Sequence, residues 1–360
     1  MNCKKLGNTG LNISSLGFGT MRLPYNNDED FTSAIALIKH ALKNGINFFD
    51  IGTFYCNHRC ETIFGQAILD NKHEIILSGK NSSHLSINEN WTVQLKNSLF
   101  RFGCEALDIY FIHYLDFDIW AKHFIMDNVI DEVNRAKNEG LIKYLGFSSH
   151  DTPEKIRKLL DTGVFDAVIL TYNLMNRTYE DTVHYAFEKG MGVIIMNPLA
   201  GGILTDRFLD LHGLKDYFGD DITGIALNYV LSNPNVHCAL SGMRTLNEID
   251  NNSNTAENHR FSTEEIGLIN DFIDRERNCK LVYCTGCGYC LPCPQGIDIP
   301  GVIKIWNTYN IVQGDDHFIR DYQILDVSAD CCIMCETCEE KCPNGVGITE
   351  IMEKTRALLK

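Results

Sequence analysis

The chain has 360 residues, of which 44% are hydrophobic and 22% charged, a balance typical of a globular protein that buries a full core. The formal net charge of -15 at pH 7 argues against nucleic acid or an anionic membrane surface as a partner, because like charges repel. No apolar run approaches the roughly 18 residues of a transmembrane helix, and the first residues lack the apolar core of a signal peptide. We therefore expect a cytoplasmic protein with no membrane partner.

Short β-branched runs alternate with longer helical stretches from residue 1 to about 255. The predicted strands are SLGFGT, NFFDIG, EIILSGK, DIYFIH, KYLGFSS, AVILTY, GVIIMN and HCALSG. Residues 31–45 and 91–103 repeat apolar side chains every three or four positions and end in Gly, as helices often do. About eight such units favour a closed α/β barrel of the (β/α)8 TIM type over an open doubly wound sheet, and no Gly-rich dinucleotide fingerprint follows the first strand.

The opening KKLGNTGLNISSLG predicts a short hairpin that turns at residues 8–10 and plugs the bottom of the barrel. After Asn254 the pattern changes. Residues 262–265 have the composition of a helix N-cap, and an apolar helix over residues 266–276 follows. We expect a barrel domain over residues 1–275 and a small helical, ferredoxin-like domain over residues 276–360.

Ten of the 15 cysteines lie between Cys279 and Cys342. With no export signal, this crowding favours metal ligation over a disulfide framework. The second run of cysteines, Cys332, Cys335, Cys338 and Cys342, is followed by a proline and has the bacterial ferredoxin spacing for 4Fe-4S ligation. The sequence therefore predicts an iron-sulfur site and an electron-transfer role.

The first run, Cys284, Cys287, Cys290 and Cys293, has a last gap that is one residue shorter. If ligands are exchanged as in two-cluster ferredoxins, Cys342 completes the first cluster and Cys293 the second. The shorter gap leaves the roles of Cys290 and Cys293 open. The alternative is a pair of zinc sites, since paired cysteines also bind zinc, but two runs of four with trailing prolines favour two 4Fe-4S clusters.

Polar residues end several predicted barrel strands, where the chemistry of such barrels is found. These are Asp50, Lys80, His113 and Ser148, and Tyr55 follows Asp50 by five residues. A lysine beside a tyrosine favours the phenolate and lowers the tyrosine pKa, so that the hydroxyl can donate a proton at neutral pH. A carbonyl oxygen needs such an acid while hydride arrives at its carbon, and His113 is expected to hold that oxygen.

The loop over residues 56–60 directly follows Tyr55. It contains three soft metal ligands, namely two cysteines and a histidine. Because only three ligands lie on one short loop, we favour an active-site rim over a metal site.

NFFDIGTFY-x5-E and DIYFIH resemble the strand-two signature and the histidine strand of the aldo-keto reductase family. The resemblance covers roughly residues 1 to 255 and implies a catalytic tetrad of Asp50, Tyr55, Lys80 and His113. Together with the run CTGCGYCLPCP, the chain resembles the subset of that family with a helical dicluster ferredoxin domain.

The same resemblance implies a nicotinamide nucleotide as cofactor. Ser148-Ser149 stands where the family has a Ser-Asn pair, MNPLAGG resembles the pyrophosphate loop, and SGMRTLNEIDNN resembles the adenosine segment. The implied cofactor-binding residues are Ser148, Ser149, Asn197, Leu199, Gly201, Ser241, Gly242, Met243, Arg244, Asn251 and Asn252. Glu248 aligns with an arginine that many NADP-preferring members use, so NADPH and NADH both stay open.

The sequence thus predicts an oxidoreductase that reduces a small aldehyde or ketone, or oxidises the alcohol, with Tyr55 as proton donor. Two clusters would exchange electrons with a ferredoxin or another redox partner. The alternative function is electron transfer or redox sensing by the clusters, with the barrel as a docking module. Hydride moves as an electron pair and clusters take single electrons, and no flavin motif is evident to join the two.

Overall fold

The computed structural model describes residues 1–69, 75–82, 91–126, 128–202, 204–205, 214, 217–219, 221–258, 260–276, 282–311, 322 and 327–358. They form two compact units, the first of residues 1–198 and 227–262 and the second of residues 199–226 and 263–360. The expected domain boundary at 275–276 remains a prediction. Within the described ranges, no helix is both long and apolar enough to span a membrane.

The first unit is a (β/α)8 barrel, which confirms the predicted fold class. Its strands are β3 (Leu16–Gly19), β4 (Phe49–Asp50), β5 (Ser78–Ser82), β6 (Leu107–His113), β7 (Ile142–Ser148), β8 (Ala167–Thr171), β9 (Gly192–Met196) and β10 (Cys238–Ser241). The sheet is parallel, in the order β4-β3-β10-β9-β8-β7-β6-β5. All eight predicted strand segments are found.

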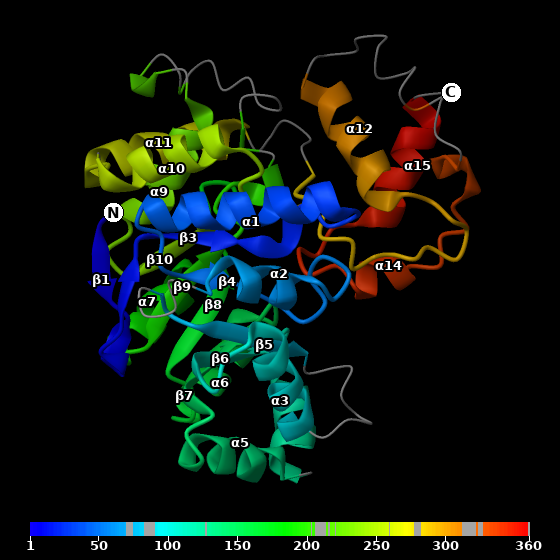
Figure 1. Cartoon of the computed structure of the whole chain (residues 1–360). Coiled ribbons are helices and arrows are strands. Elements are labelled where there is room, and N and C mark those ends of the chain that lie inside the picture. Colours follow the sequence, from blue (N-terminus) through cyan, green and yellow to red (C-terminus); the bar gives the residue numbers. More distant parts are fainter. Residues whose placement is uncertain are drawn as a thin grey trace. The chain divides into compact units, whose positions relative to one another are not determined.

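Helices cover the outside of these strands (Figure 1). They are α1 (Asp28–Lys43), α2 (Cys60–Ala67), α3 (Trp91–Phe102), α4 (Phe117–Ile119), α5 (Val129–Asn138), α6 (Pro153–Asp161), α7 (Glu180–Glu188), α9 (Ile222–Ser232) and α10 (Leu246–Glu257). In α1 the buried residues Ala34, Leu37, Ile38 and Ala41 form one apolar stripe. Asn27 caps this helix by accepting a hydrogen bond from the backbone N–H of Asp30 at 2.9 Å.

The barrel closes between β4 and β5, at the two ends of the strand order. Among the described residues, the two strands are joined there by one parallel bridge between Phe48 and Ile76, and the Thr53 N–H donates to the Lys80 carbonyl at 3.3 Å. Side chains complete the seam: the Ser78 hydroxyl donates to the Phe49 carbonyl at 2.7 Å, and the Thr53 hydroxyl donates to the Lys80 carbonyl at 3.0 Å. The seam therefore depends on polar side chains at the position where the catalytic residues are predicted.

The predicted hairpin is confirmed by β1 (Cys3–Lys5) and β2 (Asn12–Ser14), which pair antiparallel. Its residues Leu6 and Ile13 are buried in the barrel core. Gly7 has φ +50°, and a Cβ there would lie 2.4 Å from the Gly190 carbonyl oxygen, so only glycine fits this approach. Since Gly190 lies just before β9, the hairpin plugs the barrel at the N-terminal ends of its strands.

The second unit is built around helices α11 (Thr263–Glu276), α12 (Ile299–Ile311), α14 (Thr337–Glu340) and α15 (Ile348–Leu358). α12 packs on α15, and buried side chains such as Val302, Ile303 and Met352 form the core between them. The predicted helix over residues 266–276 is confirmed as part of α11. Residues 301–325, between the cysteine runs, are predicted to be helical from their sequence; they are helical in α12 up to Ile311, and residues 312–321 and 323–325 lie outside the described residues.

The buried Glu61 side chain at the start of α2 forms an ion pair with Arg101 of α3 and is 1% exposed. Removing one partner of a buried pair leaves the other charge uncompensated. We predict that Glu61→Ala lowers the free energy of unfolding of the barrel by about 3 kcal/mol. Anaerobic urea denaturation followed by circular dichroism measures this loss.

The matched control is Glu154→Ala, which removes an exposed partner of Lys158 and leaves stability unchanged, because exposed pairs contribute little. Equal losses in the two variants would contradict the structural role of the Glu61–Arg101 pair.

Candidate functional site

Three of the four predicted catalytic residues lie on neighbouring barrel strands. Asp50 ends β4, Lys80 lies in β5 and His113 ends β6, while Tyr55 lies in the turn that follows β4. Asp50 and Lys80 are buried, at 8% and 3% exposure. The C-terminal ends of parallel strands meet at one face of a barrel, so the fold brings these distant residues together.

Lys80 contacts both of the other polar groups. Its Nζ lies 2.6 Å from Asp50 Oδ1 and donates to the Tyr55 hydroxyl at 3.4 Å. The Tyr55 hydroxyl in turn donates to Asp50 Oδ2 at 3.4 Å. The Asp50 carboxylate lies at ion-pair distance from the buried Lys80 side chain and compensates its charge. The three side chains form one closed hydrogen-bonded group.

Two histidines lie beside this group. The His113 ring meets the Tyr55 ring edge-on, with centroids 5.8 Å apart and planes at 88°. His150, which the sequence reasoning missed, stacks at an angle on Tyr114. Burial and the charge of Lys80 lower the pKa of His150 to about 4, so its ring is neutral at pH 7. Its position directly after the Ser148-Ser149 pair was the available signal.

The Ser148-Ser149 pair is buried and braces the turns after β6 and β7. Ser148 Oγ accepts a hydrogen bond from the Tyr114 N–H at 3.0 Å, and Ser149 Oγ accepts one from the Asp151 N–H at 3.2 Å. Thr171, also buried, ends β8 on the same face of the strand as the core residue Ile169, and its hydroxyl has no partner within the described residues. Such an orphaned polar group fits a ligand that supplies a hydrogen bond.

The segment that resembles a pyrophosphate loop has left-handed backbone at Asn197, Ala200, Gly201 and Gly202. Asn197 belongs to the barrel unit, where its carbonyl accepts a hydrogen bond from the Asn173 side chain at 2.8 Å. Leu199 and Gly201 belong to the second unit. There Gly201 packs on the first cysteine run, because a Cβ at Gly201 would lie 2.2 Å from the carbonyl oxygen of Thr285.

The segment that resembles an adenosine site joins β10 to α10. Glu248 closes a capping box with Thr245, and its carboxylate accepts a hydrogen bond from the Arg244 N–H at 2.6 Å. Asn252 is buried and donates to Ser241 Oγ at 3.1 Å, so it braces the strand. Met243 is buried, whereas Gly242, Arg244 and Asn251 are exposed.

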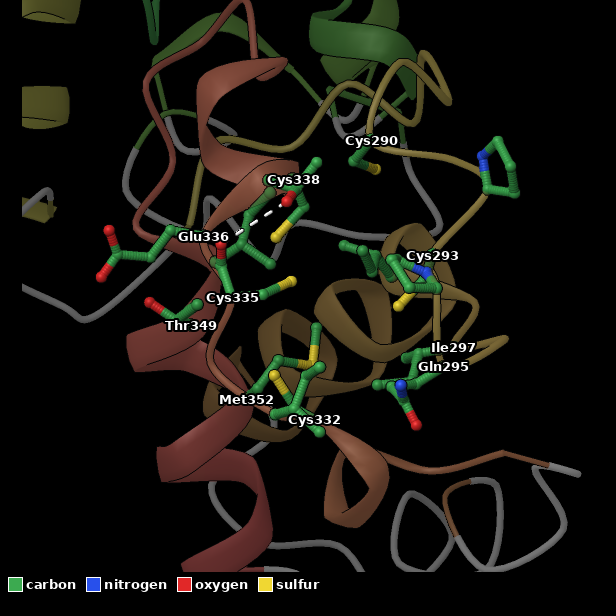
Figure 2. Close-up of a pocket in the computed structure, with 16 residues that line it drawn as sticks. Cys290, Cys293, Gln295, Ile297, Cys332, Cys335, Glu336, Cys338, Thr349 and Met352 are labelled. Atoms are coloured by element: carbon green, nitrogen blue, oxygen red, sulfur yellow. Dashed lines mark hydrogen bonds between the residues drawn. The ribbon is translucent and has the colours of Figure 1, made fainter.

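The second unit brings the two cysteine runs together around two pockets. One pocket has a volume of about 440 Å³, which includes open solvent at its mouth. It is lined by Cys332, Cys335, Cys338, Cys293 and Cys290. In Figure 2 the sulfur atoms of Cys335 and Cys338 face the space that Cys293 borders from the opposite side. Three cysteines of the second run thus meet the last cysteine of the first run.

The other pocket, of about 310 Å³, is lined by Cys284, Cys287, Cys290 and Cys342. This is the reciprocal set, three cysteines of the first run with the last of the second. Cys331 is exposed and lines neither of these pockets.

Most of these cysteines pack against the apolar core of the second unit. Burial raises the pKa of Cys290 to about 12 and that of Cys338 to about 11. Such thiols become thiolates only when a cation such as iron replaces the proton. No group of three or more His, Cys, Asp or Glu side chains in the described part of the chain is placed to hold a single metal ion. One pocket is lined by five cysteines and the other by four, with Cys290 lining both, so each pocket offers the four thiolates that a 4Fe-4S cluster needs.

Comparisons with known proteins divide the chain in a similar way. The model of the Aldo/keto reductase family matches residues 15–274, and that of the 4Fe-4S dicluster domain matches residues 283–346. Uncharacterized oxidoreductase YqkF of Bacillus subtilis (strain 168) is 26% identical over 302 residues, which cover 74% of this chain and 94% of that protein. L-galactose dehydrogenase of Arabidopsis thaliana is 26% identical over 280 residues, or 69% and 86% of the two chains.

Solved structures share the barrel fold. The holo form of aldo-keto reductase AKR11C1 from Bacillus halodurans has a TM-score of 0.66 at 24% identity and covers 76% of this chain and 96% of that one. An aldo/keto reductase from Klebsiella pneumoniae in complex with NADP and acetate has a TM-score of 0.65 at 19% identity, covering 75% and 95%. The chain therefore belongs to the aldo/keto reductase family, as an oxidoreductase whose barrel is followed by a 4Fe-4S dicluster domain.

Proposed function

We propose that this protein reduces a small aldehyde or ketone, or oxidises the corresponding alcohol, with Tyr55 as the proton donor. The hydrogen-bonded group of Tyr55, Lys80 and Asp50 carries the proposal. When the carbonyl oxygen gains negative charge, the Tyr55 hydroxyl supplies its proton and Lys80 stabilises the resulting phenolate. Asp50 holds the ammonium in place. His113, edge-on to Tyr55, orients the substrate oxygen.

A bound nicotinamide nucleotide supplies hydride to the carbonyl carbon. The polar residues present fit such a group, since the orphaned Thr171 hydroxyl is buried at the C-terminal end of β8. In the proposal, Ser148, Ser149 and Asn197 lie toward the nicotinamide end and Leu199 and Gly201 hold the pyrophosphate. Ser241 to Arg244, with Asn251 and Asn252, form the adenosine side. Glu248 is already bound to backbone N–H groups of its own turn, so Arg244 is the cation proposed to distinguish NADPH from NADH.

We further propose two 4Fe-4S clusters with exchanged ligands. Cys284, Cys287, Cys290 and Cys342 hold one, and Cys332, Cys335, Cys338 and Cys293 hold the other. The two pockets support this assignment, because each combines three cysteines of one run with the last cysteine of the other. The clusters supply single-electron transfer to and from a redox partner, which a ferredoxin-type carrier fits.

We predict that Tyr55→Phe lowers kcat for carbonyl reduction by at least about 100-fold, because it removes the acid but keeps the ring. An anaerobic assay of nicotinamide absorbance with a panel of aldehydes and ketones, run with NADH and with NADPH, measures the loss. Tyr185→Phe is the control: its hydroxyl donates to Asp161 at the protein surface, outside the site, and full activity is expected.

An unchanged rate in Tyr55→Phe would contradict the role of Tyr55. If the purified holoprotein binds neither NADH nor NADPH at millimolar concentration, the reductase proposal fails and the electron-transfer or sensing role takes its place.

Paired substitutions test the exchange of cluster ligands. We predict about eight iron atoms per native chain, falling to about four in Cys293→Ser/Cys332→Ser, because both changes affect one cluster. Cys284→Ser/Cys293→Ser should lose nearly all iron, because the two changes affect different clusters. Iron analysis and electron paramagnetic resonance of the dithionite-reduced protein provide the readout.

Cys331→Ser is the matched control and should keep all its iron. The opposite ranking of the two double variants would show that each run binds its own cluster, and zinc in place of iron would overturn the assignment altogether.

A further inference from the structure

Two buried cysteines lie in the turn that follows Tyr55. Cys56 is 4% exposed and Cys60 is 0% exposed, and both thiols contact Thr20. Cys60 Sγ donates to Thr20 Oγ1 at 3.0 Å, and Cys56 Sγ contacts the Thr20 carbonyl at 3.4 Å. The third soft ligand of this loop, His58, is exposed and contacts the ring of Phe54. The loop therefore presents a dithiol, and the histidine lies apart from it.

The backbone of this turn is strained at its first cysteine. Cys56, Asn57 and His58 have φ values of 52°, 51° and 65°, a left-handed conformation that disfavours side chains and favours glycine. Hydrogen bonds from the Arg59 N–H to the Cys56 carbonyl at 3.1 Å and from the Cys60 N–H to the Tyr55 carbonyl at 3.4 Å hold the turn. Glycine would adopt this conformation without strain. A cysteine at position 56 therefore indicates that the thiol itself has a function.

The two thiols differ chemically. The neighbouring Cys60 thiol lowers the pKa of Cys56, whereas burial raises the pKa of Cys60 well above its ordinary value. Cys56 is thus the better nucleophile, and Cys60 remains a protonated thiol beside it. Because both sulfur atoms contact Thr20, the pair suits the roles of an attacking and a resolving cysteine.

We propose that Cys56 and Cys60 form a reversible dithiol–disulfide site that reacts with peroxide. The Cys56 thiolate attacks one peroxide oxygen, which breaks the O–O bond and gives a sulfenic acid and hydroxide. The Cys60 sulfur then displaces the sulfenic hydroxyl and its proton leaves with it as water. Two thiols lose two electrons and two protons, and the peroxide becomes two waters. A dithiol restores the reduced pair by exchange.

The disulfide affects the site through the turn. A sulfur–sulfur bond is about 2 Å long, so the two sulfur atoms must leave their contacts with Thr20 and the turn that carries Tyr55 must adjust. The Thr20 hydroxyl donates to the Asp50 carbonyl at 2.6 Å. Misplacement by about 1 Å costs up to 100-fold in rate. We expect at least about tenfold lower kcat in the oxidised protein.

Trypsin offers a direct test on the native holoprotein, because it cleaves after Lys43, Arg59 and Lys72. The resulting peptides, 44–59 and 60–72, each contain one cysteine. After anaerobic treatment with equimolar hydrogen peroxide and alkylation, mass spectrometry should find them joined by a disulfide. Dithiothreitol should separate them and restore kcat. If both peptides are found separately alkylated, or joined to other cysteines, the proposal is wrong.

Two variants separate this site from damage to the clusters. Cys56→Gly suits the left-handed backbone, and Cys60→Ser keeps a donor to Thr20, so both should fold and reduce carbonyls. In both, peroxide should no longer lower kcat tenfold, while Cys104→Ser should respond like the native chain. Equal sensitivity in all forms would overturn the link between this pair and Tyr55. The peptide test does not depend on the proposed carbonyl chemistry, so the two can fail separately.

Discussion

The ion pair between Lys80 and Asp50 is the interaction on which the barrel and its proposed chemistry both depend. In the described part of the chain, β4 and β5 are joined by the Phe48–Ile76 bridge and few backbone hydrogen bonds, and the ion pair crosses the same seam toward the C-terminal ends of the strands. Burying two charges is unfavourable unless they meet at close range and are further hydrogen-bonded. Tyr55 supplies those hydrogen bonds, so the proposed proton donor also stabilises the closure of the sheet.

The second unit gathers two runs of cysteines beside an apolar core. Its core residues come largely from α12 and α15, and cysteines of both runs pack against this core. Partial burial raises the pKa values of Cys290 and Cys338, so these thiols keep their protons unless a cation binds the sulfur. In this unit Gly201 also packs against Thr285. The segment around Gly201 therefore lies against the first cysteine run.

Several roles changed when the tertiary contacts were known. Glu248 aligned with a nucleotide-binding arginine, but in the structure it caps α10. Glu61, the acidic residue of the strand-two signature, is paired with Arg101 and holds α2 against α3. His150 was overlooked although it directly follows the Ser148-Ser149 pair. Lys80 lies in β5 and His150 follows β7, and β6 separates these two strands in the sheet, so only the tertiary structure shows that the charge of Lys80 acts on His150.

The sequence by itself determined the barrel, the N-terminal hairpin that plugs it, and the two cysteine runs. Apolar periodicity and cysteine spacing are local properties, so they can be read along the chain without any tertiary contact. The sequence also indicated Asp50, Tyr55, Lys80 and His113, since strand ends are identifiable from the same periodicity. Tertiary structure alone decided which cysteines share a pocket and that Cys56 and Cys60 both contact Thr20. It also showed that the Thr171 hydroxyl on β8 is buried without a partner among the described residues. These relations join residues that are distant in the sequence, so no local pattern encodes them.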